Sequence, residues 1–367
     1  MSCDLLSLAT KGVAGLQPYH AGKPMSELQR ELGLSDIVKL ASNENPMGPS
    51  QRVLDAIAAM TDLSRYPDGN GFELKQVLAN KHGLSIDQIT LGNGSNDVLE
   101  MTARAFVTSE HEVIYSKHSF AVYPIVTQAV GASHVVIPAQ DWAHDLDAMR
   151  QAITDKTRLM FIANPNNPTG TWVNRTVLRQ CLEMVPEHVI VLVDEAYFEY
   201  GCLEAEYPDA SQWLGDFPNL IVTRSFSKAY GLAALRIGYA MSHPDISNLL
   251  NRVRQPFNNN QFALVAAEAS LADSQHLEHG IQINSSGMRY LTKSLDDMGL
   301  EYIPSLGNFI CINFEQEAEP LYQQLLKAGV IVRPVANYGM PNYLRVSIGL
   351  EHENTKFIHE LGRILAA

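Results

Sequence analysis

The segment 225–228 combines the hydroxyl groups of Ser225 and Ser227 with the amine of Lys228, and Arg236 follows eight residues later. Hydroxyl and guanidinium groups can converge on a phosphate. A lysine that is partly desolvated beside such a site can have a lowered pKa and act as a nucleophile. A lone lysine on a loop would instead be solvated, so the neighbouring residues are what predict an anion site with a nucleophilic Lys228.

Asp194 follows the apolar run 189–193. An isolated carboxylate at the end of a buried strand would be unfavourable. A protonated pyridine nitrogen is a fitting partner, because the ion pair keeps such a ring an electron sink. Tyr197, three residues on, could reach a phenolic oxygen on the same ring. A helix N-cap or a structural salt bridge is the alternative for Asp194.

Two further loops follow predicted strands. The stretch 164–170 reads Asn-Pro-Asn-Asn-Pro-Thr-Gly; it could be an ordinary turn, or a rigid one that presents the Asn167 amide to the same phenolic oxygen. The stretch 92–97 contains two glycines and Ser95-Asn96 before a predicted helix, whose N-terminus attracts anions. It lacks the third glycine of a dinucleotide fingerprint and the lysine of a nucleoside-triphosphate loop.

Two arginines stand near the C-terminal end of the chain. Arg333 precedes a proline, and Arg345 lies in the strand-like stretch 343–348. An unpaired guanidinium there would be unfavourable, and a carboxylate or phosphate of a substrate would relieve that. A structural Asp or Glu partner is the alternative.

The elements that position these residues follow from hydrophobic periodicity. Between residues 88 and 242, short apolar runs alternate with amphipathic ones, which predicts a doubly wound α/β domain with a mainly parallel sheet. Such domains bind ligands at the carboxyl ends of their strands, where the loops above lie. The predicted strands are 89–91, 112–115, 133–137, 159–163, 189–193, 220–223 and 236–240. The predicted helices include 96–106, 123–130, 146–153 and 175–184.

The pattern changes after about residue 262. A long helical stretch, 261–299, precedes short strands at 309–314 and 343–348, a helix at 321–328 and a closing helix. We therefore predict a large domain over 46–262 and a smaller α+β domain over 263–367. Residues 1–45 are predicted as an arm and small-domain segment, lying on the small domain or on a partner subunit.

Composition narrows the classes of partner. The net charge of −13 disfavours nucleic acid and anionic lipid. No apolar run reaches the roughly 18 residues that span a membrane, and the N-terminus lacks a signal-peptide pattern, so we expect a cytoplasmic protein. The four cysteines are expected to be reduced thiols. His276 and His279 share a helix face but have no evident third ligand, so no metal site is predicted.

In this order and placement, the motifs resemble the pyridoxal-phosphate aminotransferases of fold type I over essentially the whole chain. Within that family the chain is similar to the histidinol-phosphate aminotransferases. The supporting stretches are 17–19 with 22–24, 39–46, 65–68, 165–170, 225–232 and 254–258.

The resemblance implies pyridoxal 5′-phosphate as the cofactor. Lys228 would bind it covalently and later move protons, and Asp194 would pair with its ring nitrogen. One departure is Ala234, where the family usually has glycine. The remaining contacts would be Phe120 stacked on the ring, Tyr197 and Asn167 at the phenolic oxygen, and Ser95, Asn96, Ser225, Ser227 and Arg236 at the phosphate.

The resemblance also implies a homodimer with shared sites, in which Tyr66 reaches the cofactor phosphate of the neighbouring subunit. Arg345 would take the α-carboxylate of glutamate, and Tyr19 and Asn43 would help define the substrate side. Since both substrates are anions, we also predict that Arg345 anchors both of them, with Tyr19 and Arg333 as helpers. The implied substrates are small anions: histidinol phosphate on one side of the reaction and glutamate or 2-oxoglutarate on the other.

The implied reaction is the aminotransferase step of histidine biosynthesis. An aromatic amino-acid aminotransferase and a threonine-phosphate decarboxylase share much of this framework and remain alternatives. A pyridoxal-phosphate-binding regulatory domain is the non-enzymatic alternative, but it would be expected to have a basic DNA-binding segment, which this acidic chain lacks.

Overall fold

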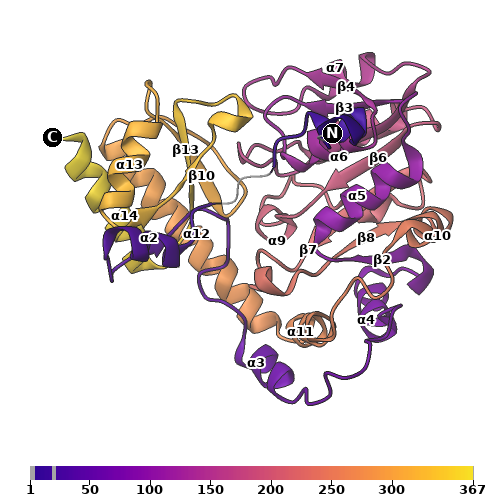
Figure 1. Ribbon diagram of the computed structural model, residues 1–367, viewed down its shortest axis with the longest axis horizontal. Coiled ribbons are helices and arrows are strands. Elements are labelled where there is room, and N and C mark those ends of the chain that lie inside the picture. Colours follow the sequence, from indigo (N-terminus) through magenta and orange to yellow (C-terminus); the bar gives the residue numbers. More distant parts are fainter. Residues whose placement is uncertain (1–4, 19–21, 367) are drawn as a thin grey trace.

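The computed structural model of the 367-residue chain describes residues 5–18 and 22–366. Within these ranges the strands form a seven-stranded sheet, a four-stranded sheet and a two-stranded pair. Figure 1 shows the large sheet with its helices on one side and the four-stranded sheet with α12, α13 and α14 on the other. The predicted α/β class with a mainly parallel large sheet is confirmed.

The large sheet has the strand order β2-β8-β7-β6-β5-β3-β4. Neighbours from β7 to β4 are parallel, whereas β8 runs antiparallel to both β2 and β7. The last predicted strand begins two residues later than expected, because Arg236 has a left-handed φ of 57°. The strands are β2 (Ile89–Gly92), β3 (Glu112–Ser116), β4 (Ser133–Ile137), β5 (Thr157–Ala163), β6 (Ile190–Asp194), β7 (Leu220–Ser225) and β8 (Gly238–Ser242).

Helices cover both faces of this sheet, which explains the continuously apolar strands. In β6, Val191 and Val193 join one core, whereas Ile190 and Leu192 join the other. The first face packs against α3 (Gln51–Ala58), α4 (Phe72–His82), α7 (Leu146–Gln151), α8 (Arg175–Met184) and α11 (Gln261–Leu271). The second packs against α5 (Ser95–Phe106), α6 (Val122–Ala129) and α10 (Pro244–Val253).

The single helical stretch expected over 261–299 is two helices. It breaks at Ala272 and Asp273, where the Asp273 carboxylate accepts a hydrogen bond from the His276 N–H at 3.2 Å and caps α12 (Ser274–Asp297). Helix α11 packs Ala263 and Leu264 into the core of the large sheet. The apolar contacts of α11 therefore belong to the large domain, past the boundary predicted at residue 262.

The small domain is built on an antiparallel sheet of order β12-β13-β10-β9. A separate parallel pair joins β1 near the start of the chain to β11. Their bounds are β1 (Val38–Lys39), β9 (Tyr302–Ile303), β10 (Phe309–Asn313), β11 (Val330–Ile331), β12 (Arg333–Pro334) and β13 (Tyr343–Ser347), with helices α13 (Glu319–Lys327) and α14 (Glu351–Leu365).

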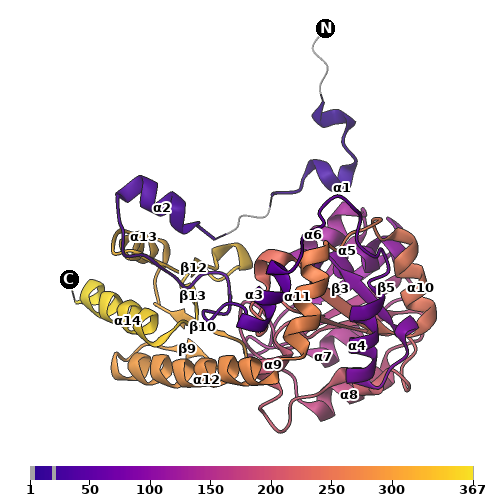
Figure 2. The same cartoon turned by 90° about the horizontal axis from the view of Figure 1, so that it is seen from below.

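The N-terminal segment contacts both domains. Helix α2 (Met25–Leu32) buries Leu28 against Leu326 of the small domain. Helix α1 (Lys11–Ala14) instead lies beside α6 of the large domain, where Gln128 Nε2 donates to the Gly12 carbonyl at 3.0 Å (Figure 2). Before it, the short 3₁₀ helix Leu6–Leu8 projects away from the body. Within the described ranges, no helix is long and apolar enough to cross a membrane.

Candidate active site

A cavity of about 690 Å³ lies at the carboxyl ends of β5, β6 and β7, where the small domain meets the large sheet. Most of the positions predicted from sequence to carry chemistry surround it. The predicted residues that line this cavity are Asn43, Ser95, Asn96, Phe120, Asn167, Asp194, Tyr197, Ser225, Ser227, Lys228, Arg236, Arg333 and Arg345.

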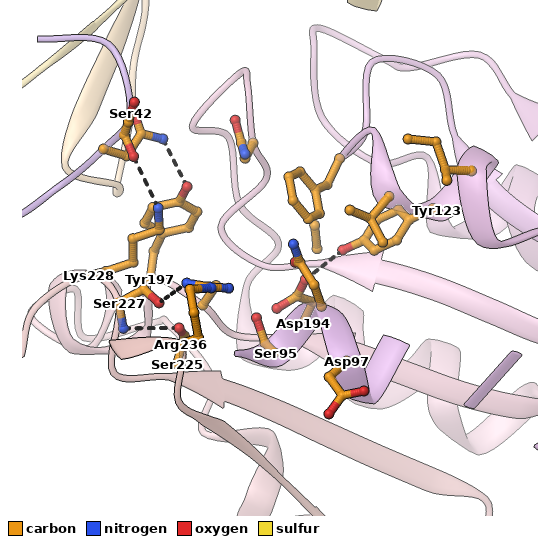
Figure 3. A pocket seen from close by; sticks show the side chains of 18 of the residues that line it. Ser42, Ser95, Asp97, Tyr123, Asp194, Tyr197, Ser225, Ser227, Lys228 and Arg236 are labelled. Atoms are coloured by element: carbon orange, nitrogen blue, oxygen red, sulfur yellow. Dashed lines mark hydrogen bonds between the residues drawn. The ribbon is translucent and has the colours of Figure 1, made fainter. Parts of the chain in front are cut away.

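One end of the cavity is a cup suited to a phosphate, which we call the phosphate cup: Ser95, Ser225, Ser227 and Arg236 (Figure 3). Arg236 Nη1 donates to Ser227 Oγ at 3.2 Å, and Ser227 N–H donates to Ser225 Oγ at 3.1 Å. Ser95 opens α5, whose free N–H groups and dipole favour an anion.

Glycine is required at the rim of the phosphate cup. Gly94 has a φ of 78°, and a Cβ there would collide with the Arg236 guanidinium. Among the described residues no carboxylate forms an ion pair with Arg236, so its charge is available to a bound phosphate. Ala234, in the 3₁₀ turn Ala233–Leu235, has an exposed side chain, so a methyl group fits where the family usually has glycine.

Lys228 reaches the middle of the cavity from the turn after β7. Its Nζ donates one long hydrogen bond, 3.3 Å, to the Ser42 carbonyl and lies 5.6 Å from the centre of the Tyr197 ring. Although part of the side chain borders the open cavity, desolvation of the amine is the main cause that lowers its pKa to about 7, and the Arg345 charge acts in the same direction. An amine whose pKa lies near neutral pH is present in its neutral form in a substantial fraction, which suits a nucleophile or a general base.

Asp194 ends β6 with its carboxylate at the floor of the cavity. Tyr123 donates to Oδ2 at 3.0 Å and Thr223 donates to Oδ1 at 3.1 Å. Burial raises the pKa of Asp194, while these two hydrogen bonds lower it. Because the carboxylate has no cationic partner at bonding distance among the described residues, a protonated ring nitrogen fits the site.

Sequence reasoning missed Tyr123 and Thr223 as partners of Asp194. Thr223 stands opposite Asp194 in the β6–β7 register, and Tyr123 lies in the first turn of α6, next to the predicted stacking residue Phe120. Thr223 could have been found from the sequence, because it stands at the carboxyl end of the strand predicted to follow the one that ends at Asp194. The 71-residue separation between Tyr123 and Asp194 left no local signal for the other contact.

Tyr197 is held by a residue that was predicted to act on the substrate side. Asn43 Nδ2 donates to the Tyr197 hydroxyl at 2.9 Å, which leaves the phenol proton free to point into the cavity. Asn43 has a left-handed φ of 53° and is fixed by Ser347 and Asn308. Burial raises the pKa of Tyr197 to about 12, so it is a neutral donor at physiological pH.

Arg345 is buried in β13 on the opposite wall. Its guanidinium donates to Asn167 Oδ1 and, at 2.7 Å, to the Ala41 carbonyl. The alternative of a structural carboxylate partner is not realised within the described part of the chain, and Nε makes no hydrogen bond. Because Asn167 accepts through Oδ1, its amide N–H groups remain as donors toward the cavity.

Arg333 lies directly opposite Arg345 in the β12–β13 pair, so both side chains are on the same face of the small sheet and both line the cavity. Both guanidinium groups therefore bring positive charge to this wall of the cavity. This wall of the cavity is therefore suited to a carboxylate or a phosphate monoester.

Two predicted residues lie elsewhere. Tyr66 does not line the cavity of its own subunit: its side chain is 80% exposed, and its ring stacks on Phe257 with ring centres 4.5 Å apart. Tyr66 belongs to the connection between α3 and α4. Figure 1 shows this connection at the lower edge of the molecule. Tyr19 falls outside the described residues.

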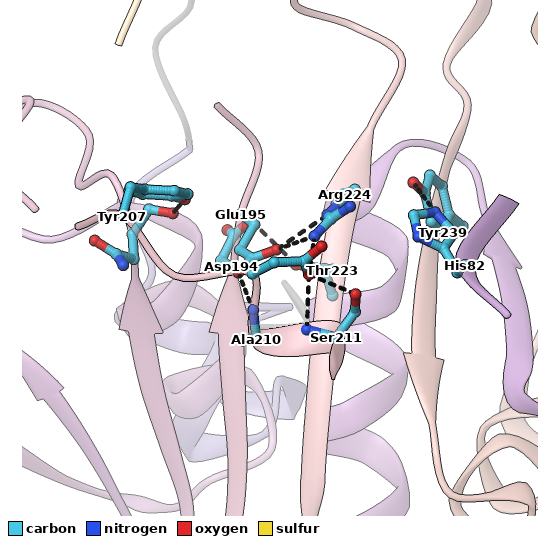
Figure 4. A network of polar contacts seen from close by, with 11 residues as sticks. His82, Asp194, Glu195, Tyr207, Ala210, Ser211, Thr223, Arg224 and Tyr239 are labelled. Atoms are coloured by element: carbon cyan, nitrogen blue, oxygen red, sulfur yellow. Dashed lines mark hydrogen bonds and ion pairs between the residues drawn. The ribbon is translucent and has the colours of Figure 1, made fainter. Parts of the chain in front are cut away.

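A buried ion-pair network supports the strand ends from the opposite face of the sheet (Figure 4). Arg224 donates to Glu195 Oε2 at 2.8 and 3.0 Å and to Asp209 Oδ1 at 2.6 Å. Thr223 and Arg224 are adjacent in β7 and point to opposite faces of the sheet. Thr223 therefore contacts Asp194 on the cavity side, whereas Arg224 holds Glu195 on the other side. Sequence reasoning did not identify this network.

Known proteins that are similar to this chain include aminotransferases. The family model for class I and II aminotransferases matches residues 35–361. Histidinol-phosphate aminotransferase 2 of Pseudomonas fluorescens is 56% identical over 100% of both chains, and histidinol-phosphate aminotransferase 1 of Idiomarina loihiensis is 54% identical over 98% of each. The solved structure of histidinol-phosphate aminotransferase from Sinorhizobium meliloti, in complex with pyridoxal 5′-phosphate, aligns with a TM-score of 0.90 and 28% identity over 98% of each chain. The chain belongs to the histidinol-phosphate aminotransferase family, within the class I and II aminotransferases.

Proposed function

We propose that this protein is a pyridoxal-phosphate-dependent aminotransferase that moves an amino group between L-histidinol phosphate and 2-oxoglutarate, giving imidazole-acetol phosphate and L-glutamate, in histidine biosynthesis. The observation that supports it is one cavity that brings together the phosphate cup, the Lys228 amine, the Asp194 carboxylate and a pair of arginines. Relatives more than 50% identical over the whole chain are histidinol-phosphate aminotransferases.

The cofactor fits the polar groups of the cavity. The phosphate cup would hold its phosphate, Asp194 its ring nitrogen, and Tyr197 with Asn167 its phenolic oxygen. When bound, the cofactor supplies an electron sink that weakens the C–H bond at the amine-bearing carbon of the substrate. Tyr123 and Thr223 keep the Asp194 carboxylate oriented, so the charge is in place before the ring arrives.

Lys228 has two roles in this proposal. Its amine would hold the cofactor covalently through a nucleophilic nitrogen and would be freed when the substrate amine binds. The free Nζ would then act as the general base that takes the proton from the amine-bearing carbon, and as the acid that gives a proton back. The pKa of about 7 in the cofactor-free protein means that a large fraction of this amine is neutral at physiological pH, which a general base requires.

Arg345 serves as the common anion anchor in this proposal, with Arg333 beside it. Histidinol phosphate presents a phosphate ester near the reacting carbon, and glutamate presents a carboxylate on that carbon. A planar guanidinium can bind either group through two parallel N–H bonds. The Arg345 side chain lines the cavity, which places its guanidinium within reach of such a ligand.

The proposal includes a homodimer with shared sites, located in the cytoplasm. Tyr66 is exposed and remote from the cavity of its own chain, and Leu5, Leu6 and Leu8 of the arm are exposed as well. A second subunit would cover these apolar groups and receive Tyr66 at its phosphate cup. Mixing inactive Lys228→Ala with inactive Tyr66→Ala subunits should restore activity, because a hybrid dimer contains one intact site. Hybrids that form but remain inactive would place Tyr66 outside the neighbouring site.

One assay tests the substrate. Amino transfer to 2-oxoglutarate should be measured from histidinol phosphate, phenylalanine, tyrosine and threonine phosphate. We expect the highest kcat/KM with histidinol phosphate. A higher value with phenylalanine or tyrosine would favour an aromatic amino-acid aminotransferase, and release of CO₂ from threonine phosphate would favour a decarboxylase.

A further inference from the structure

The segment 254–260, between α10 and α11, contacts two parts of the site that lie on different sides of it. On one side it holds the connection between α3 and α4 that presents Tyr66. On the other it holds the turn between β2 and α5 that forms the rim of the phosphate cup. No residue of the segment 254–260 lines the cavity. The segment therefore has no direct part in the chemistry described so far.

The contacts with the Tyr66 connection are both polar and aromatic. Arg254 Nη1 donates to the Gly69 carbonyl at 2.8 Å, and the Phe257 ring stacks on Tyr66 at an interplanar angle of 18°. Phe257 has a left-handed φ of 55°, an unfavourable conformation for a bulky residue, and its side chain is 44% exposed. Such strain is retained where the surroundings impose it, often near functional sites, and here it directs the ring toward Tyr66.

The contacts with the phosphate cup run through Asn258 and its neighbour. Asn258 Nδ2 donates to Asp97 Oδ2 at 2.7 Å, and the same oxygen accepts the Asn93 N–H at 2.9 Å. Asn259 Nδ2 donates to the Gly92 carbonyl at 2.8 Å. Asp97 lies in the first turn of α5 and borders the cavity, two residues after Ser95. The turn that positions the helix N-terminus for a phosphate is therefore held by this segment.

A single hydrogen bond joins the two sides. Arg254 Nη1 also donates to Asn258 Oδ1 at 2.8 Å, so one guanidinium holds the Tyr66 connection and the amide that holds Asp97. Burial lowers the pKa of Arg254, and the carboxylates of Asp97 and Asp68 oppose that shift. If the phosphate cup or the α3–α4 connection moved, the two hydrogen bonds donated by Arg254 would lengthen or break.

We propose that Arg254 and Asn258 are positioning residues that tie Tyr66 to the phosphate cup of its own subunit, so that an ordered cup in one subunit steadies the tyrosine that serves the partner's site. The proposal rests on the proposed function, in which Tyr66 acts across the dimer. It adds that the two sites of a dimer are linked through the segment 254–258.

The test uses purified holoenzyme heterodimers with a different tag on each subunit. One subunit, the helper, has Lys228→Ala, so only the site of the other subunit, the working site, is catalytically active. The working site consists of its own phosphate cup and of Tyr66 from the helper. Arg254→Met or Asn258→Ala is then placed in the helper alone. We expect kcat at the working site to fall about tenfold with each, the effect of losing one charge-assisted hydrogen bond. Arg252→Met in the helper is the matched control, because Arg252 is exposed and its Nε donates to Asn248 of the same helix.

A double variant separates positioning from general stability. If Arg254 acts through Tyr66, Tyr66→Phe with Arg254→Met in the helper should be no slower than Tyr66→Phe alone. Additive losses, or normal rates with both Arg254→Met and Asn258→Ala, would overturn the inference. An effect of Arg254→Met without one of Asn258→Ala would overturn the link to the cup.

The controls also distinguish this inference from the proposed function. Tyr66→Phe in the helper must itself slow the working site. If Tyr66→Phe matters only when placed in the working subunit, the arrangement of Tyr66 across the dimer fails, whatever Arg254 does. If a helper with Arg254→Met does not form dimers, Phe257→Leu replaces it: loss of the stacked ring should slow the working site, and an unchanged rate would count against the inference.

Discussion

Replacing Asp194 by asparagine tests the anionic floor of the cavity. The two carboxylate oxygens accept hydrogen bonds from Tyr123 and Thr223, and the side chain is 5% exposed. Asparagine has nearly the same shape, and one of the two hydroxyl groups can turn to accept its amide N–H. We therefore expect Asp194→Asn to fold and to lose the charge with little change in packing.

The expected effect on catalysis follows from that charge. Removing one partner of a buried ion pair costs about 3–5 kcal/mol, which corresponds to a loss of about two to four powers of ten in the amino-transfer half-reaction. Tyr123→Phe is the graded comparison, because it keeps the charge and removes one hydrogen bond to it. A hydrogen bond to a charged group contributes about 1.5–3 kcal/mol, so its loss should slow the half-reaction by roughly one to two powers of ten.

The assay is the single-turnover rate of the absorbance change when the cofactor-loaded protein meets an amino donor. Thermal unfolding of each variant controls for the fold. Near-normal rates for Asp194→Asn would remove Asp194 from its proposed role. Equal losses for Asp194→Asn and Tyr123→Phe would show that the position of the carboxylate, and not its charge, is what the rate depends on.

Three further perturbations test other parts of the site. Burial and the Arg345 charge lower the pKa of Lys228 to about 7. The rate at which cofactor-free protein captures pyridoxal phosphate should therefore rise about tenfold per pH unit below pH 7 and level off above it. After borohydride reduction, an adduct mapped to any other lysine would contradict the assignment. Arg345→Lys should retain the cofactor but slow both half-reactions, measured separately in single turnovers; slowing of the glutamate half-reaction alone would mean that the phosphate has another anchor. Arg224→Met removes the cationic partner of the buried Glu195 carboxylate and of the partly buried Asp209 carboxylate, so the free energy of unfolding should fall by about 3–5 kcal/mol in denaturant titrations. Arg179, whose partly exposed side chain pairs with Glu183 and Asp216, is the comparison: Arg179→Met should change the free energy of unfolding by about 1 kcal/mol or less, and equal effects would refute this reasoning.

The sequence by itself determined the elements of the large domain and the residues at their ends. Apolar runs and helix starts are local patterns, set by side-chain period and by capping, so the predicted strands of the large sheet lie within about two residues of those observed. The rule that ligands bind at the carboxyl ends of parallel strands then placed Lys228, Asp194 and Asn167 around one cavity before any contact was known.

Only the tertiary structure decided which side chains meet. Tyr123 is 71 residues from Asp194, Asn43 is 154 from Tyr197 and Arg345 is 178 from Asn167, and each pair depends on how separate elements pack. Hydrogen bonds act over about 3 Å and depend on angle. A shift of one residue in strand register, which moves every side chain to the other face of the sheet, therefore changes every partner. The hydrogen bond from Arg254 to the Gly69 carbonyl, 185 residues away, is of the same kind. Local patterns determine the elements, whereas the partners of polar side chains are determined by the packing of elements distant in sequence.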